Sequence, residues 1–323
     1  MKRLAVMLLL TGIFILGLTG CGTAGGLKQE STAYEVTDDF GTAVRFPKKP
    51  QRIYASTMSL NEILTDLVPP DRITAVPQSA RDPGQSLIAD RTAQIRKTVP
   101  DILHIEGIIA LHPDLVIMQV HDPAMVQTLR DMGIPVFATK VPVNLEQVKM
   151  HIQSVASAVG EPAKGEETVK ILDDKVRRVQ RIVNGIPQER RRILMAYSSQ
   201  GIFGSREGLF HDICTQAGVW NGAAMAGLVR NEHVSKEKLI EINPDVLLLP
   251  DAGSSGQGNE SKIEEEILRD PSLRVLKAVQ NHQIVRIKDR YRYAASQYMG
   301  DAVWIIASKV YSDYFEGKDI NRD

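Results

Sequence analysis

Arginine and tyrosine alternate near the end of the chain, in the run Arg290-Tyr291-Arg292-Tyr293. The run follows an apolar segment that is typical of a buried strand. Guanidinium groups donate hydrogen bonds in a fixed fork that suits oxyanions, and tyrosine rings offer flat surfaces with a polar end. The run therefore indicates contacts to an anionic ligand with flat groups. A solvated turn explains the same residues equally well.

Further ligand candidates come directly after predicted strands or in the long loops beside them. Ligands bind beyond the carboxyl ends of strands in open α/β sheets, and a chain with two lobes adds a cleft between them. With Tyr291, Arg292 and Tyr293, the candidate set is Met58, Arg81, His121, Tyr197 and Arg230. The positive charges of Arg81, Arg230 and Arg292 would suit an anionic ligand.

Each of these residues also has a purely structural interpretation. Met58 would serve as core filler, and His121 would stand at the start of a helix. Arg81 would pair locally with Asp82, in an ion pair that contributes little to stability. Tyr197 would close a strand. The sequence leaves these alternatives open.

Other chemistry has little support in the sequence. None of the seven histidines belongs to a His-x-x-x-His or Cys/His cluster, so a bare metal site is not expected. The glycine-rich segment 251–259 lacks the Lys-Ser/Thr of a phosphate loop, and no Gly-x-Ser-x-Gly elbow occurs. Cys214 lies in an apolar helical pattern and is interpreted as a small buried residue. The sequence predicts neither an enzyme nor a resident cofactor.

The composition is that of a soluble globular protein. The 323 residues include 39 Lys+Arg and 39 Asp+Glu, and 43% are apolar, close to the usual averages. This balance argues against a nucleic-acid partner, which normally selects a basic face. The length suggests about two domains.

The first residues predict export. Lys2 and Arg3 precede an uncharged stretch of about fifteen residues, shorter than the ~20 that a spanning helix needs, as in a secretory signal. Leu18-Thr19-Gly20-Cys21 follows and resembles the lipobox of bacterial lipoproteins, which implies a signal peptide over 1–20 and lipid on Cys21. The alternative is an ordinary signal peptide with a chance cysteine. Residues 21–33 are interpreted as a flexible tether, and the protein as an extracytoplasmic lipoprotein anchored to the membrane.

Strands and helices alternate through most of the remaining chain. A hairpin is predicted over 34–46, and strands over 52–55, 73–76, 115–118 and 136–138, with helices at 60–67, 106–111 and 124–132. Helices over 145–159 and 163–183 follow. Alternation resumes with strands at 192–197, 246–249 and 283–287 and helices at 209–216, 236–242, 263–268 and 294–315. Short apolar strands between helices favour parallel sheets.

This order predicts an α/β fold with two Rossmann-like lobes of mainly parallel sheet, joined by a long α-helix that spans them. The boundaries are 34–160 for the N-terminal lobe, 161–187 for the interlobe helix and 188–323 for the C-terminal lobe. The alternative is that the long charged helix belongs to the surface of one lobe.

A repeat relates the two predicted lobes. Glu106-Gly-Ile-Ile-Ala-Leu-His-Pro113-Asp recurs 131 residues later as Glu237-Lys-Leu-Ile-Glu-Ile-Asn-Pro244-Asp. Each copy predicts a short helix that stops at proline and leads into a buried strand. A carboxylate in the first helical turn stabilises the helix dipole by about 0.3–1 kcal/mol, which explains both glutamates structurally. The alternative is that they form a matched pair for a basic partner.

The repeat, with Arg52-Ile53, Asn61-Glu62, Phe203-Gly204-Ser205 and Ser296-Gln297-Tyr298, resembles the class III substrate-binding proteins of ABC importers. These handle ferric siderophores, haem and vitamin B12. The resemblance covers about residues 34–315 and implies two α/β lobes, a spanning helix and limited closure. It also implies that Glu106 and Glu237 pair with arginines of the permease.

The resemblance implies a monomeric lipoprotein that delivers its ligand to an ABC permease and its ATPase. The arginines favour a ferric siderophore or related metal chelate, held in the interlobe cleft. The alternatives are haem or cobalamin binding and, as a different class, an extracellular enzyme or sensor on the same fold.

Overall fold

The computed structural model describes residues 33–198, 201–229, 235–251 and 260–321. The hairpin predicted over 34–46 is confirmed as the antiparallel pair β1 (Tyr34–Thr37) and β2 (Ala43–Phe46). Asp38 closes its turn, because the carboxylate accepts hydrogen bonds from the backbone N–H groups of Phe40 and Thr42 at 3.0 and 2.9 Å. This is the side-chain-to-backbone bonding that makes Asp a turn residue.

The first parallel sheet has the strand order β3-β6-β7, and we call this part of the chain the N-lobe. Its strands are β3 (Ile53–Ala55), β6 (Leu115–Gln119) and β7 (Val136–Thr139), and the helices between them are α1 (Met58–Leu67), α3 (Ile105–Ile109) and α4 (Pro123–Asp131). Almost every strand residue is buried. Parallel strands covered on both faces are continuously apolar, which is why the sequence pattern reveals them.

The strand predicted over 73–76 is wrong. Ile73 forms only an isolated bridge with Ile53, and both the backbone N–H and the hydroxyl of Thr74 donate to the Ile53 carbonyl, at 2.9 and 3.0 Å. The chain therefore crosses the edge of β3 without extending along it. β4 (Val76–Pro77) pairs instead with β5 (Thr98–Val99).

A second parallel sheet has the strand order β10-β8-β11-β12, and we call this later part of the chain the C-lobe. Its strands are β8 (Ile193–Ser198), β10 (Trp220–Asn221), β11 (Val246–Pro250) and β12 (Ile284–Ile287). β9 (Gly201–Phe203) pairs antiparallel with β8 and was not predicted from the sequence. The helices among these strands are α7 (Leu209–Gln216), α8 (Gly222–Met225), α9 (Lys236–Ile242), α10 (Glu260–Arg269) and α11 (Lys277–Gln280).

The predicted α/β fold with parallel sheets in two lobes is thus confirmed. Shorter helical segments complete it: α2 (Ala89–Thr92) and the 3₁₀ turns η1 (Pro70–Arg72), η2 (Gln78–Arg81), η3 (Gln188–Arg190), η4 (Pro271–Val275) and η5 (Asp289–Tyr293). Among the described residues, no helix combines the length and apolar character of a membrane span.

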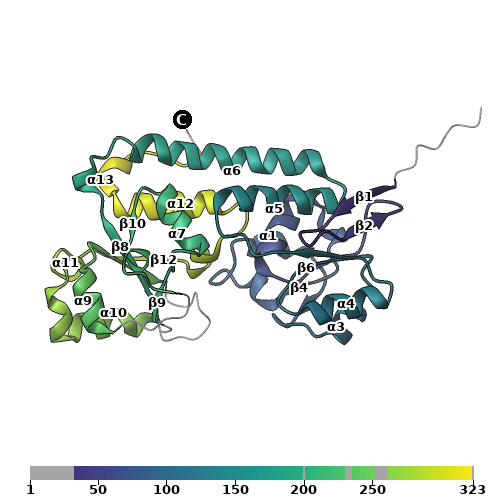
Figure 1. Cartoon of the computed structure of the whole chain (residues 1–323), viewed down its shortest axis with the longest axis horizontal. Helices are drawn as coiled ribbons and strands as arrows, with labels where there is room; N and C mark the ends of the chain where they lie inside the picture. The colour runs from purple at the N-terminus through teal and green to yellow at the C-terminus, as the bar shows by residue number, and fades with distance from the viewer. Residues whose placement is uncertain (1–32, 199–200, 230–234, 252–259, 322–323) are drawn as a thin grey trace, which may run out of the picture. The chain divides into compact units, whose positions relative to one another are not determined.

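A long helix, α6 (Pro162–Val183), contacts elements of both lobes. It packs against α5 (Leu145–Ala158) and α1 on one side of the chain and against α12 (Met299–Val310) and α7 on the other. Figure 1 shows α6 extending over both α5 and α12. A Cβ on Gly165 would lie 2.5 Å from the Cβ of Ala156, and one on Gly300 would lie 2.9 Å from the Cβ of Lys175. These glycines allow α5 and α12 to approach α6 closely.

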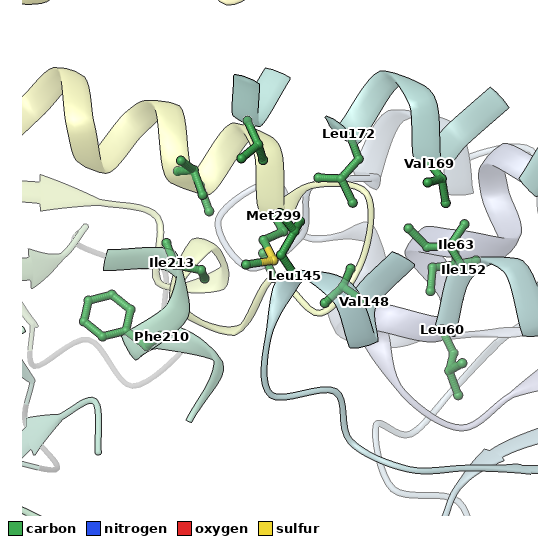
Figure 2. Close-up of a cluster of buried hydrophobic side chains, with 14 of the residues drawn as sticks. Leu60, Ile63, Leu145, Val148, Ile152, Val169, Leu172, Phe210, Ile213 and Met299 are labelled. Atoms are coloured by element: carbon green, nitrogen blue, oxygen red, sulfur yellow. The ribbon is translucent and has the colours of Figure 1, made fainter. Parts of the chain in front are cut away.

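One hydrophobic core runs through both lobes. It extends from Val44 and Phe46 to Val310 and Phe315, and its centre is formed by α5, α6 and α12. Figure 2 shows this continuity, with Ile63 of α1, Val148 of α5, Leu172 of α6, Met299 of α12 and Ile213 of α7 in one cluster. Because close-packed cores resist continuous deformation, the joint between the lobes is stiff.

The last helix is shorter than predicted. A helix was expected over 294–315, but α12 begins only at Met299 and ends at Val310, and α13 (Ser312–Phe315) follows it. Ser296 and Gln297 lie outside the helix because their side chains donate hydrogen bonds to Glu62 of the N-lobe, at 2.6 and 2.7 Å.

Candidate functional site

Two of the predicted ligand residues follow the carboxyl ends of adjacent N-lobe strands. Met58 is the first residue of α1, after β3, and His121 follows β6. The two strand ends are tied together, because the backbone N–H of Gln119 donates to the Ser56 hydroxyl at 3.1 Å. Met58 is partly buried against the core, whereas His121 is exposed beside Asp122, the residue that caps α4. The sheet therefore places both residues at one edge.

Arg81 ends η2 and is exposed. Its guanidinium donates to the Ile95 carbonyl, and the described residues show no ion pair between Arg81 and Asp82. The Asp82 carboxylate accepts instead from the Gln85 amide and the Gly84 backbone N–H, at 2.6 and 2.8 Å. These bonds hold the pKa of Asp82 below its usual range, so the local ion pair is the wrong interpretation of Arg81.

Tyr197 lies within β8, opposite Ile202 of β9, and is partly buried against a C-lobe cluster of apolar residues. The strand continues to Ser198. Tyr197 is therefore not the last strand residue, because the unpredicted strand β9 extends the pairing.

Two other predicted residues, Arg230 and Cys21, lie outside the described residues, as do the predicted signal peptide and most of the tether.

The Arg–Tyr run forms η5, and its arginines are largely buried. Arg292 is only 2% exposed and pairs with Asp289, so the solvated turn is the wrong interpretation for this residue. Its guanidinium lies 4.9 Å from the ring centroid of Phe203 and 5.6 Å from that of Tyr293. The two rings meet edge to face at 4.8 Å. Arg292 is therefore held between a carboxylate and two aromatic rings.

One donor of this guanidinium remains without a partner. Nη1 of Arg292 is buried and has no hydrogen-bond acceptor among the described residues. An unsatisfied buried donor costs about 1–3 kcal/mol, so an additional acceptor would be favourable here. Tyr293 beside it is 44% exposed.

Tyr291 faces the core more than solvent. It is partly buried and packs against the shared core. Burial raises the pKa of its phenol, with smaller contributions from the charges of Asp301 and Glu62. Tyr291 is therefore a neutral phenol at physiological pH.

The segment around η5 also reaches across to the N-lobe. Nζ of Lys288 donates to the Pro83 carbonyl at 2.8 Å, and Nε of Arg290 donates to Glu62 Oε1 at 2.9 Å. The sequence alone does not predict this contact of Glu62. A signal was present, because this glutamate stands among Leu60, Ile63 and Leu64 on the buried face of α1.

The repeated Pro-Asp pairs have a structural role. The Asp114 carboxylate accepts from the backbone N–H groups of Gln51 and Arg52, at 2.8 and 2.7 Å, and the Asp245 carboxylate accepts from that of Ile193 at 2.8 Å. Each aspartate thus joins the start of one strand to its parallel neighbour. The two lobes use the same device at equivalent positions.

Glu106 and Glu237 differ from these aspartates, because both are exposed and neither forms an ion pair within the described part of the chain. Glu106 lies in the first turn of α3 and Glu237 in the first turn of α9. Bonds from the Ser235 side chain and from its own backbone N–H hold the pKa of Glu237 below its usual range. In Figure 1, α3 and α9 lie on the opposite side of the lobes from α6.

The described residues also form a groove of about 780 Å³ beside the end of α6 and along α7 and α8. Its lining includes Arg206, His211 and Trp220. It contains none of the predicted ligand residues that the structure describes. Within the same ranges, no group of three or more His, Cys, Asp or Glu side chains could hold a metal ion.

A family model described as periplasmic binding protein matches residues 54–291. The chain belongs to the periplasmic binding protein family. The resemblance seen in the sequence is therefore confirmed, and the chain is a binding protein rather than an enzyme. Among curated relatives, an uncharacterized ABC transporter substrate-binding lipoprotein of Bacillus subtilis, YvrC, is 22% identical over 316 residues, which cover 93% of this chain and 94% of the relative.

Solved structures of several binding proteins share the fold. The periplasmic heme-binding protein RhuT from Roseiflexus, in its apo form, is 25% identical with a TM-score of 0.70, covering 82% of this chain and 99% of RhuT. The molybdate-binding protein MolA of Haemophilus influenzae is 18% identical with a TM-score of 0.72, covering 89% and 94% of the two chains. This periplasmic binding protein therefore has a fold that serves chemically different ligands.

Proposed function

We propose that this periplasmic binding protein is the substrate-binding component of an ABC importer, and that it captures a ferric siderophore or a related metal chelate between its two lobes. The observation that carries the proposal is the matched pair of exposed glutamates. Glu106 and Glu237 stand at equivalent positions of the two lobes, while the paired aspartates of the same repeat are used structurally.

The residues of η5 support an anionic ligand. Arg292 keeps one buried donor without a partner, beside the exposed ring of Tyr293. A carboxylate, hydroxamate or catecholate oxygen of a chelate would accept from this donor, in a bond strengthened by charge. Met58, Arg81, His121, Tyr197, Arg230 and Tyr291 complete the proposed ligand site.

The two glutamates would dock the protein on its permease. Both carboxylates are exposed, so they are available to cationic groups on a partner, and complementary charges set orientation and association rate. The proposed partners are an ABC permease, whose basic side chains receive one glutamate from each lobe, and the ATPase bound to that permease. The binding protein itself acts as a monomer.

A lipid on Cys21 would keep the protein outside the cytoplasm and at the membrane. The lipobox-like sequence supports this, as does the description of the relative YvrC as a lipoprotein. Cys21→Ser should move the protein from the membrane fraction to the soluble extracytoplasmic fraction. A variant that stays with the membrane would contradict the anchor.

Haem is the second candidate ligand, favoured by the 25% identity to RhuT, whose described ligand is haem. Its propionates would suit the same arginine. Cobalamin is the third candidate and depends less on positive charge.

A fluorescence titration tests the proposed ligand class. The chain has two tryptophans, and iron chelates, haem and cobalamin all absorb in a range that quenches indole emission. Titration with ferric desferrioxamine, a ferric catecholate, haemin and cyanocobalamin should give saturable quenching with a Kd of about 1 μM or lower, near −8 kcal/mol, for a ferric chelate. Saturation by haemin alone would select the second candidate, and no saturable response to any of the four would overturn the proposal.

A further inference from the structure

The carboxylate of Glu62 is fully buried where the two lobes meet. It projects from the middle of α1, and its side chain has no solvent exposure. Oε1 accepts from Nε of Arg290 at 2.9 Å, and Oε2 accepts from Nη2 of Arg290 at 3.1 Å and from the Ser296 hydroxyl at 2.6 Å. All three donors come from a segment more than 220 residues later in the chain.

The same segment is held at further points. Nη2 of Arg290 also donates to the Ser59 hydroxyl at 2.7 Å, and the Gln297 amide donates to the Glu62 carbonyl at 2.7 Å. Nη1 of Arg290 turns back to the carbonyl of Tyr293 at 3.2 Å. One arginine therefore connects α1 to the backbone of η5.

These bonds join two parts of the proposed ligand site. Met58 begins α1, and Tyr291, Arg292 and Tyr293 belong to η5. The Arg290 contact to the Tyr293 carbonyl lies next to the ring that packs on Phe203 at 4.8 Å. The position of η5 relative to α1 thus depends on the Glu62–Arg290 pair.

Stability alone is a poor explanation of such a pair. Removing two charges from water costs several kcal/mol, and apolar residues of similar volume often stabilise a protein as well or better. A fork of two parallel bonds from arginine to carboxylate does, however, fix orientation. Close control of geometry is what a preformed ligand site requires.

We infer that Glu62 is a positioning residue, which orients Arg290 and thereby holds the ligand segment Asp289–Tyr293 of the C-lobe against α1 of the N-lobe. The expected effect on ligand affinity rests on the proposed function. The expected effect on the position of residues 289–293 does not depend on any ligand.

The variants Glu62→Gln and Arg290→Lys test the inference, with Lys288→Met as the matched control. Glu62→Gln removes the charge at nearly constant shape, and Arg290→Lys keeps the charge but loses the fork. Lys288 also bonds across the lobes, to the Pro83 carbonyl, and this bond is exposed. If one of the first two variants fails to fold, the other carries the test.

The first measurement needs no ligand. Hydrogen exchange of the backbone amides in residues 288–298 should be about tenfold faster or more in Glu62→Gln and in Arg290→Lys. The reason is that the free energy of local opening in this segment falls by about 1.4 kcal/mol. Exchange within α4, which packs on β7 of the N-lobe, should remain within about threefold. Unchanged exchange in 288–298, or equal acceleration in Lys288→Met, would overturn the inference.

The second measurement is affinity for ferric desferrioxamine and haemin, well below the unfolding temperature of each variant. For whichever probe binds the parent protein, Glu62→Gln should bind at least about tenfold more weakly, and Lys288→Met within about threefold of the parent. A lower unfolding temperature with unchanged affinity would show a merely structural role. If neither probe binds the parent protein, the proposed function loses support, while hydrogen exchange still decides the positioning role.

Discussion

His112 and Asn243 occupy equivalent positions in the two lobes, and both adopt the left-handed backbone conformation, with φ of 48° and 47°. Each follows a short helix with an exposed glutamate in its first turn, and each precedes a Pro-Asp pair. This conformation costs roughly 1–2 kcal/mol for a residue other than glycine. The same turn therefore occurs in both lobes. It sets the direction of α3 relative to β6 and of α9 relative to β11.

The matched helices lead to a prediction about transport. The double variant Glu106→Ala/Glu237→Ala should lower uptake at least tenfold, equivalent to about 1.4 kcal/mol of docking free energy, because each lobe would lose the charged contact that we propose it makes with the permease. Ligand affinity should not change, since neither glutamate belongs to the proposed ligand site. Uptake of a ferric chelate by cells and fluorescence titration of the purified variant measure the two quantities.

The control for that experiment is Glu166→Ala/Glu167→Ala, which removes the same charge from exposed positions on α6. This helix lies on the other side of the lobes (Figure 1). The control should transport normally. Normal uptake by Glu106→Ala/Glu237→Ala would instead remove the basis of the docking assignment.

Contact between α5 and α6 depends on Gly165. In Gly165→Ala the new Cβ would lie 2.5 Å from the Cβ of Ala156, and overpacking of this kind costs about 1–3 kcal/mol. Urea denaturation should show that loss, and adding Ala156→Gly should restore most of it. If the double variant is no more stable than Gly165→Ala alone, the clash is not with Ala156.

Acid should destabilise the protein through His151 of α5. This side chain is buried, neither ring nitrogen has a partner among the described residues, and burial lowers its pKa from 6.5 to about 4. Between these values the unfolded chain binds the proton and the folded protein does not, so stability falls as the pH drops from about 6.5 to about 4. The loss over that range is about 3 kcal/mol.

Replacing His151 by leucine should flatten this dependence, since leucine cannot be protonated. Urea denaturation at several pH values from 4 to 7 measures the slope for each variant. The exposed residue His104 supplies the control, because His104→Gln should keep the slope of the parent. An unchanged slope in His151→Leu would assign the acid sensitivity to other groups.

Cys214 should be unreactive in the folded protein. It is fully buried in α7, and burial raises the pKa of its thiol, so the reactive thiolate is absent at neutral pH. In a Cys21→Ser background, a colorimetric thiol reagent should label less than about a tenth of the protein in buffer and one thiol per chain in denaturant. Rapid labelling without denaturant would mean that α7 opens readily.

The sequence predicts the elements whose signal is local. Parallel strands such as Leu115–Gln119 are apolar throughout because both faces are covered, and the repeat around Glu106 and Glu237 is visible because both lobes need the same helix and turn. β9 was missed, because three residues opposite the end of β8 carry no pattern of their own. The helix expected from residue 294 was wrong, because Ser296 and Gln297 are used by a glutamate more than 200 residues away.

In the candidate site, too, local sequence patterns are visible but contacts between distant residues are not. The residue types of the Arg–Tyr run predict a ligand segment, but they do not show that Arg292 is buried against Phe203 while Tyr293 remains exposed. That difference depends on β9, which supplies Phe203. Glu62 could not be assigned a partner, because its ion pair joins the two lobes and leaves no periodic trace in the sequence.

The shared core also determines when the chain can fold. α12 contributes Met299, Val303 and Ile306 to the cluster that it shares with α5 and α6, and residues 184–298 separate the end of α6 from the start of α12. An N-lobe synthesised alone would expose the apolar faces of α5 and α6 that α12 covers later. The shared core is therefore complete only after every strand of the C-lobe sheet has been synthesised, because β8 to β12 all precede α12 in the chain. Truncation before α12 would leave both lobes without their common support.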